Sequence, residues 1–306
     1  MDNAIVQVNG LFKQYGPKTA VDHVSFEVAD GEIFGILGPN GAGKTTTLEM
    51  IEGIRVPDGG TAIVDGLDVR KHRRRVQQNI GVQLQVTTLF DKLTVAETVR
   101  FFAALYPRSV PVARLMDDFA LNPIAKDYAS DLSGGQRQRL SMALALVNDP
   151  RVVFLDEPST GLDPQSRRAI WEVVKRLRQG GKTVVLTTHY MEEAEVLCDR
   201  VAIMDDAKII ALDTPQAMID SLKVDRTIEC RLSGEITVKD LEGLPAVRRV
   251  NTSGDDLVLQ VEDLEVSMSG LIRLVDARGA KMEDLRVHSP SLEDVFLNLT
   301  GKWLRN

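Results

Sequence analysis

The feature that most constrains the fold of this chain is residues 38–45, which fit the pattern G-x-x-x-x-G-K-[ST]. An apolar run at residues 33–37 precedes the pattern and predicts a buried strand. Helix-compatible residues 44–52 follow and stop at Gly53. In this strand–turn–helix context, backbone N–H groups and the positive end of the helix face an anion. The sequence therefore predicts a phosphate-binding loop.

Two side chains of the loop are expected to act on a nucleoside triphosphate. Lys44 is expected to reach the β- and γ-phosphates, and the hydroxyl of Thr45 is expected to bind Mg²⁺. The candidate nucleotide-binding residues of this stretch are Gly38, Pro39, Asn40, Gly41, Ala42, Gly43, Lys44, Thr45 and Thr46.

The composition indicates a globular protein with one large and one small domain. The chain has 306 residues, of which 43% are hydrophobic and 26% are charged. No apolar run reaches the roughly 18 residues of a membrane-spanning helix. The net charge of −7 argues against a nucleic-acid-binding surface. Cys198 and Cys230 are far apart in sequence and are expected to be reduced thiols in the cytosol.

Strands that alternate with helices predict an α/β fold with a mainly parallel sheet and helices on both faces. Apolar runs at residues 80–84, 152–155 and 183–187 supply further strands of this sheet. Residues 5–8 and 21–28 read as strands of an N-terminal antiparallel β subdomain, since apolar and polar residues alternate in the second.

A helical insertion is expected at about residues 86–130. Thr94 and Glu97 form a capping-box pattern, so a helix should start at Val95. A second short helix is expected to bury Leu115, Phe119 and Ala120.

The pattern changes near Leu222, which predicts a first domain at residues 1–222 that contains the phosphate-binding loop and a small C-terminal α+β module at residues 223–306. A basic run at residues 70–75 is either a solvated face or a surface for acidic lipid or a partner loop.

Two acidic residues follow the buried run at residues 152–155. Asp156 stands at the strand end, where a carboxylate can hold Mg²⁺ directly or through water. Glu157 comes next and points in another direction, so we expect it to orient or deprotonate the attacking water.

A second glycine-rich helix start lies at residues 132–136, with Ser133 as N-cap. It is an anion site without a lysine, and one nucleotide does not need two such sites from one subunit. Two subunits that face each other head to tail would use both, each closing the other's ATP.

With these stretches in this order, the chain resembles the nucleotide-binding subunit of an ABC transporter over about residues 4–220. Residues 38–45 match the Walker A motif, 132–136 the signature and 152–156 Walker B. Glu157 matches the catalytic glutamate.

The resemblance implies roles for further residues. Tyr15 would stack on adenine, although a turn aromatic is the alternative. Gln85 would be the Q-loop residue near Mg²⁺, with Gln83 as a competitor, and His189 would sense the γ-phosphate. The partner-facing ATP contacts would be Ser133, Gly134, Gly135 and Gln136, together with Asp163 in the segment 159–163 that crosses the dimer interface.

The family therefore implies a cytoplasmic Mg²⁺-dependent ATPase that is peripheral to the inner face of the membrane through a permease. Residues 289–297 resemble the closing segment of ATPases from ABC-2 type exporters of drugs and lipids. A soluble ABC ATPase that acts on ribosomes or DNA is the alternative, but this chain has one set of motifs and no long coiled coil. The C-terminal module is expected to regulate or strengthen the dimer; a ligand-sensing role stays open, and the cargo is not indicated.

Overall fold

The computed structural model describes residues 4–85, 89–222, 226–233, 236–253 and 256–301, which form two compact units that divide after Pro215. Within these residues, every helix is too short or too polar to span a membrane. Cys198 and Cys230 are buried, and neither forms a disulfide.

The first unit is built on a six-stranded sheet with the order β10-β9-β3-β8-β7-β6. All neighbours are parallel except β10, which pairs antiparallel with β9. Central strands β3, β8 and β7 are buried along their whole length, as expected for strands covered on both faces. The prediction of a mainly parallel sheet is confirmed. Its strands are β3 (Ile33–Leu37), β6 (Ile80–Gln83), β7 (Val152–Asp156), β8 (Thr183–Thr188), β9 (Arg200–Asp205) and β10 (Lys208–Asp213).

A second, antiparallel sheet has the order β2-β1-β4-β5 and confirms the predicted N-terminal β subdomain. Its first two strands are longer than predicted, because polar residues extend the hairpin as far as the Tyr15↔Lys18 pair. Its strands are β1 (Ala4–Tyr15), β2 (Lys18–Ala29), β4 (Gly59–Val64) and β5 (Leu67–Asp68).

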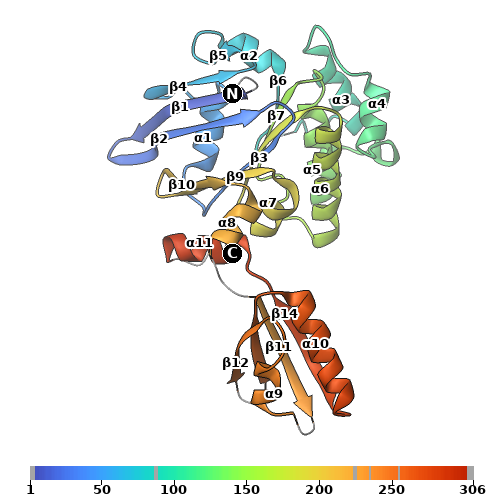
Figure 1. Ribbon diagram of the computed structural model, residues 1–306. Coiled ribbons are helices and arrows are strands. Elements are labelled where there is room, and N and C mark those ends of the chain that lie inside the picture. Colours follow the sequence, from blue (N-terminus) through green and yellow to red (C-terminus); the bar gives the residue numbers. More distant parts are fainter. Residues whose placement is uncertain (1–3, 86–88, 223–225, 234–235, 254–255, 302–306) are drawn as a thin grey trace. The chain divides into compact units, whose positions relative to one another are not determined.

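Helix α1 (Lys44–Ile51) packs between the two sheets, against β2 and β4 on one side and β7 and β8 on the other. The prediction of helices on both faces is confirmed, and the antiparallel sheet covers one of these faces together with α1. Phe26 and Phe34 stack between the sheets with ring centroids 4.9 Å apart. The other face carries α5 (Gly134–Ala145), α6 (Pro164–Gln179) and α7 (Met191–Leu197) (Figure 1).

The helical insertion contains α3 (Val95–Ala104), α4 (Val112–Asp118) and two 3₁₀ turns. The predicted Thr94–Glu97 capping box is present at the start of α3. Ala120 was expected to be buried, but it is exposed with a φ of 49°, because α4 ends at Asp118. Met116 is buried beside Leu115 and Phe119 instead.

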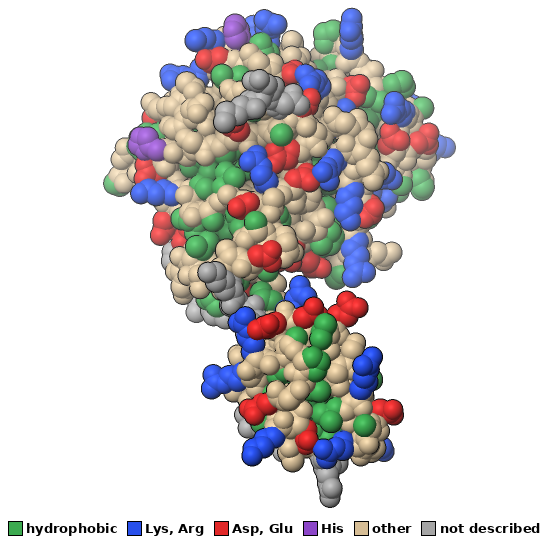
Figure 2. All heavy atoms as spheres, viewed as in Figure 1, with side chains coloured by type: hydrophobic (Ala, Val, Ile, Leu, Met, Phe, Trp, Pro, Cys, Tyr) green, Lys and Arg blue, Asp and Glu red, His purple; other side chains and the backbone are tan. Residues whose placement is uncertain are grey.

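The basic run at residues 70–75 is exposed, and α2 (Arg73–Asn79) begins within it. Over the face shown in Figure 2, acidic and basic side chains of the first unit are interspersed.

The second unit contains a four-stranded antiparallel sheet with the order β12-β13-β11-β14. Together with α9 and α10 this gives the βαββαβ arrangement of a split βαβ fold. Its own core contains Ile228, Cys230, Leu259 and Leu271. The elements are α8 (Pro215–Ser221), β11 (Arg226–Ser233), α9 (Val238–Glu242), β12 (Val247–Ser253), β13 (Asp256–Val261), α10 (Leu264–Ala277), β14 (Lys281–His288) and α11 (Leu292–Thr300).

Candidate functional site

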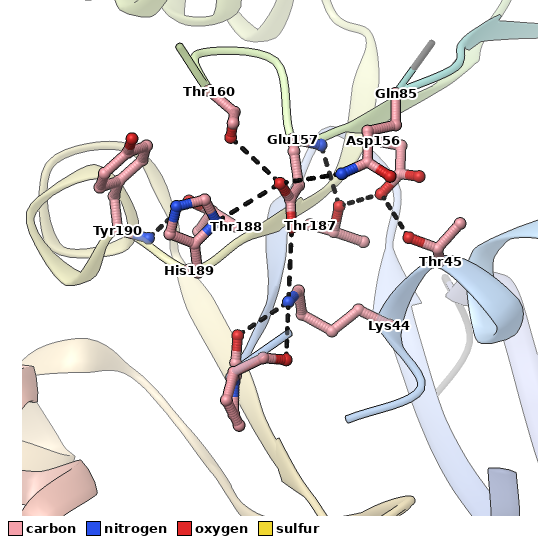
Figure 3. Close-up of polar contacts among 12 residues, drawn as sticks. Lys44, Thr45, Gln85, Asp156, Glu157, Thr160, Thr187, Thr188, His189 and Tyr190 are labelled. Atoms are coloured by element: carbon pink, nitrogen blue, oxygen red, sulfur yellow. Dashed lines mark hydrogen bonds and ion pairs between the residues drawn. The ribbon is translucent and has the colours of Figure 1, made fainter. Parts of the chain in front are cut away.

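The predicted chemical residues meet at the carboxyl ends of β3, β7 and β8. Parallel register sets Leu37 beside Thr188 and Asp156 beside Thr187, so the segments that follow these strands start at one edge of the sheet. Figure 3 shows Lys44, Glu157 and His189, which follow different strands, converging there.

A pocket of about 380 Å³ lies at this edge. It includes nine of the predicted residues and two that the sequence analysis missed, Lys18 and Ala20 on β2. The predicted hairpin turn next to Tyr15 was a signal for Lys18, which pairs directly with Tyr15. The lining residues are Tyr15, Lys18, Ala20, Asn40, Gly41, Gly43, Lys44, Thr45, Thr46, Gln85 and Glu157.

The loop after β3 owes its shape to glycine. Gly43 has a φ of 104°, and a Cβ there would collide with the carbonyl oxygen of Ala20. A Cβ at Gly38 would collide with the carbonyl oxygen of Met204. No side chain caps the start of α1, so its first N–H groups can receive phosphate oxygens.

Lys44 is folded into this loop and is only 4% exposed. Its Nζ donates to the carbonyl oxygens of Gly38 at 2.8 Å and Pro39 at 3.1 Å, and lies 3.5 Å from Glu157 Oε1. Burial lowers the pKa of the ammonium, and the Glu157 carboxylate opposes that shift. The structure therefore holds a cation directly beneath the loop.

Two of the three predicted metal ligands are in contact. Thr45 Oγ1 donates to Asp156 Oδ1 at 3.2 Å, and Thr187 Oγ1 donates to the same oxygen. Burial raises the pKa of Asp156, while hydrogen bonds from Thr187 and Thr45 oppose the shift. A hydroxyl and a carboxylate are oxygen donors of the kind that suit Mg²⁺, which usually takes few protein ligands beside phosphates. These residues fit the ion.

Gln85, the third predicted metal ligand, turns its side chain elsewhere. Its Nε2 donates to Glu157 Oε2 at 3.2 Å. Gln83 is buried behind the pocket, where its Nε2 donates to the Leu84 carbonyl oxygen at 2.6 Å. Of the two glutamines, Gln85 is the one that lines the pocket.

Glu157 is the centre of the polar contacts. Its Oε2 accepts from Thr160 Oγ1 at 3.1 Å and lies 3.4 Å from His189 Nδ1. Burial acts to raise its pKa, but the charge of Lys44 and the polar contacts with His189 and Thr160 outweigh this, so the pKa is lowered and the carboxylate stays ionised. Its φ of 48° is a strained conformation, held by a 3.0 Å hydrogen bond from its N–H to Thr187 Oγ1.

The second glycine-rich helix start lies outside this pocket. Ser133 Oγ accepts from the Gln136 N–H at 3.3 Å, and Gln136 Oε1 accepts from the Ser133 N–H at 2.8 Å, which completes a capping box. Ser133 and Gly134 are exposed, and a Cβ at Gly135 would lie 2.8 Å from Ser166 Oγ. The structure does not bring these residues together with Lys44 in one chain.

Asp163 also lies outside the pocket. Its carboxylate caps α6 by accepting from the N–H groups of Gln165 and Ser166, each at 3.0 Å, and from Ser166 Oγ at 2.6 Å. Both carboxylate oxygens are therefore used locally.

Two family models match this chain. A family model described as "ABC transporter" matches residues 21–160, and one described as "ATP-binding protein DrrA1-3-like, C-terminal domain" matches residues 224–300. A Nod factor export ATP-binding protein I from Paraburkholderia xenovorans is 42% identical, with all of both chains covered. A linearmycin resistance ATP-binding protein from Bacillus subtilis is 36% identical over 99% of this chain and all of its own.

Solved structures match the first unit. A dimeric bacterial ABC transporter cassette has 25% identity and a TM-score of 0.63, and the match covers 68% of this chain and 98% of that one. A dimeric cassette in a post-hydrolysis state with ADP and phosphate has 26% identity, the same coverage and the same TM-score.

Proposed function

Because this chain belongs to the family of ABC transporter ATP-binding proteins and is an ATPase, we propose that two copies, clasped head to tail around ATP, drive a separate membrane permease. Export is the proposed direction, since relatives that match the whole chain are named for export or for resistance. Those full-length matches disfavour the alternative of a soluble ABC ATPase. The protein would be held at the inner face of the membrane by its permease.

The placement of the residues at the sheet edge supports the role that we propose for each within one copy. The loop at residues 38–46 and Lys44 bind the phosphates, and Tyr15 stacks on the base. Thr45 and Asp156, with Gln85 nearby, would hold Mg²⁺, which would supply positive charge to neutralise the phosphates. Glu157 accepts a proton from the attacking water or orients it, and His189 faces the same carboxylate.

The observation that best supports the proposed dimer is that the two glycine-rich helix starts lie apart within one chain. Ser133, Gly134, Gly135 and Gln136 form an exposed, capped helix start outside their own pocket. We assign this surface to the ATP of the second copy, with Asp163 shaping the adjoining segment. Residues 1–222 are the proposed ATPase domain and residues 223–306 the accessory domain.

The permease contact is proposed at a second pocket of about 400 Å³, whose lining includes Glu52, Leu84, Phe102 and Tyr106. Leu84 is next to Gln85, and Phe102 belongs to α3. A partner bound there would contact both the segment next to Gln85 and the helical insertion, so movements of either would be transmitted to it. This location supports transfer of the ATP-driven motion to the permease.

The dimer is tested with Glu157→Gln, which should bind ATP, hydrolyse it poorly and collect as an ATP-bound dimer in light scattering. Adding Gly134→Asp should abolish the dimer and leave ATP binding intact. A Cβ at this position has room, 3.7 Å from Leu162, and an acidic side chain suits the first turn of a helix. The same carboxylate would repel the partner's phosphates.

Lys44→Ala tests the role of the phosphate-binding loop, and this variant should lose most of its ATP binding or ATP turnover. Parental hydrolysis by Glu157→Gln would contradict the base assignment. An undiminished dimer in the Gly134→Asp double variant would contradict the head-to-tail arrangement.

A further inference from the structure

We infer that Arg167 and Tyr190 position His189 against Glu157. The inference rests on the proposed role of His189 and adds two residues that act through it. Neither Arg167 nor Tyr190 lines the pocket or contacts Glu157. Their effect on the reaction must therefore pass through the imidazole.

Three flat side chains stand in series beside the site. The ring centroids of His189 and Tyr190 are 4.2 Å apart, with planes inclined by 40°. The guanidinium carbon of Arg167 lies 4.3 Å from the centroid of the Tyr190 ring. Figure 3 shows the phenol ring on the side of His189 that faces away from Glu157. The imidazole is therefore confined between the phenol and the carboxylate.

The imidazole has little else to fix its orientation. Its Nδ1 is buried and has no partner that meets hydrogen-bond geometry among the described residues; the ion-pair contact to Glu157 Oε2 is 3.4 Å long. A ring on a single flexible side chain can rotate about two bonds. Contact with the tilted Tyr190 ring restricts that rotation, which keeps one ring nitrogen directed at Glu157.

The two stacking residues are themselves anchored. Tyr190 is the N-cap of α7, and its N–H donates to Thr188 Oγ1 at 3.0 Å. The backbone of Arg167 is fixed in the first turn of α6, where its N–H donates to the Asp163 carbonyl oxygen at 2.9 Å. The contacts of Arg167 with Tyr190 and of Tyr190 with His189 thus connect the start of α6, beside the segment 159–163, to the histidine.

The test is steady-state phosphate release by the full chain with Mg²⁺ and ATP. Tyr190→Leu removes the ring and keeps apolar bulk, so kcat should fall about tenfold or more, because small misplacements at a reacting centre are costly. The KM for ATP should stay within about twofold, since the pocket lining is unchanged. Tyr190→Phe keeps the ring and should restore the parental kcat. Arg167→Gln should lower kcat with the same sparing of KM.

The same substitution in a His189→Ala background separates positioning from general damage. There Tyr190→Leu should cause no further loss, because the side chain through which it acts is gone. Parental kcat in Tyr190→Leu, or an equal further loss without His189, would overturn the inference. If Tyr190→Leu does not fold in a thermal melt, Arg167→Gln makes the same comparison. Parental activity in His189→Ala would instead overturn the role proposed for the histidine.

Discussion

Two ionisable side chains of the site, Lys44 and Glu157, are almost removed from water, and each depends on its neighbours for its charge. Lys44 lies 3.5 Å from Glu157, whose carboxylate keeps the ammonium charged against the effect of burial. Glu157 in turn owes its lowered pKa to Lys44 and His189. Removing one member leaves a buried charge without compensation, which costs several kcal/mol. Alanine variants in this group should therefore be less stable than the parent, and a thermal melt checks that they still fold.

Glu52 presents the opposite case, a buried carboxyl without hydrogen-bond partners among the described residues. It is 1% exposed and immediately follows α1. Burial raises its pKa to about 8, and the nearby Asp156 and Glu49 add to the shift. Between its ordinary pKa and about 8, the unfolded chain releases this proton while the folded chain keeps it. The free energy of unfolding therefore falls as pH rises through that window.

We predict that Glu52→Gln removes this pH-dependent loss. Relative to the parent, the variant should gain on the order of 3 kcal/mol of stability between pH 5 and pH 8, because each pKa unit is worth about 1.36 kcal/mol. Urea-induced unfolding at the two pH values measures it. Glu172→Gln, at an exposed glutamate of α6, is the matched control and should show no such trend. An equal difference between parent and Glu52→Gln at both pH values would refute the prediction.

Helix α3 buries one face in the helical insertion and exposes apolar side chains on the other. Its capping box fixes the start, and Val95, Thr98, Val99 and Ala103 are buried. Its other face exposes Phe101, and Leu105, which follows the helix, is 60% exposed. Phe101 meets Phe90 edge to face at 5.4 Å between ring centroids. Exposed apolar side chains mark interaction surfaces. We therefore extend the proposed permease contact from the pocket that Phe102 lines to this exposed face of the helical insertion.

Leu105→Lys tests this surface without disturbing the helix, because a basic residue is favourable at a helix C-terminus. ATPase activity of the isolated chain should stay within about twofold, while the permease that co-purifies with the parent should drop about tenfold or more, equivalent to about 1.4 kcal/mol of binding. Val196→Lys places the same change on an exposed apolar residue of α7 and should leave co-purification intact. Undiminished permease with Leu105→Lys would argue against the assigned contact.

Elements with local signals were the ones that the sequence could predict. The Thr94–Glu97 box and the buried strand before Asp156 depend on a few neighbouring residues, and both are present. The register of parallel strands then brings their ends together without further information. The prediction that Ala120 is buried was wrong, because it extended the helical spacing of Leu115 and Phe119 past Asp118, where α4 ends.

Features that depend on tertiary pairing could not be predicted in this way. Ala20 lines the pocket because β2 passes close to the loop at Gly43, and Glu52 is buried because α1 lies between two sheets. The stacking of Arg167 on Tyr190 joins two helices whose relative placement no local pattern encodes. Strand β9 is different, because the apolar run at residues 201–204 is a local signal from which this strand could have been predicted.

At the scale of the molecule, the question is why an ATPase unit is joined to a second unit with its own core. Ile228, Leu259 and Leu271 are fully buried within that second core. A chain lacking residues 223–306 should therefore keep the first unit folded and able to bind ATP. We predict that it loses dimer strength, since we assign the C-terminal unit to supporting the pair.

The measurement is the monomer–dimer dissociation constant with ATP, in chains that carry Glu157→Gln so that the dimer is not consumed by hydrolysis. Truncation should raise this constant about tenfold or more, which corresponds to about 1.4 kcal/mol. Leu271→Asp in the full chain places an unpaired charge in the second core and should reproduce the effect, because a buried unpaired charge is strongly destabilising. Circular dichroism and ATP binding check that the first unit is intact. An unchanged dissociation constant in both variants would remove the C-terminal unit from dimer formation and leave ligand sensing as its role.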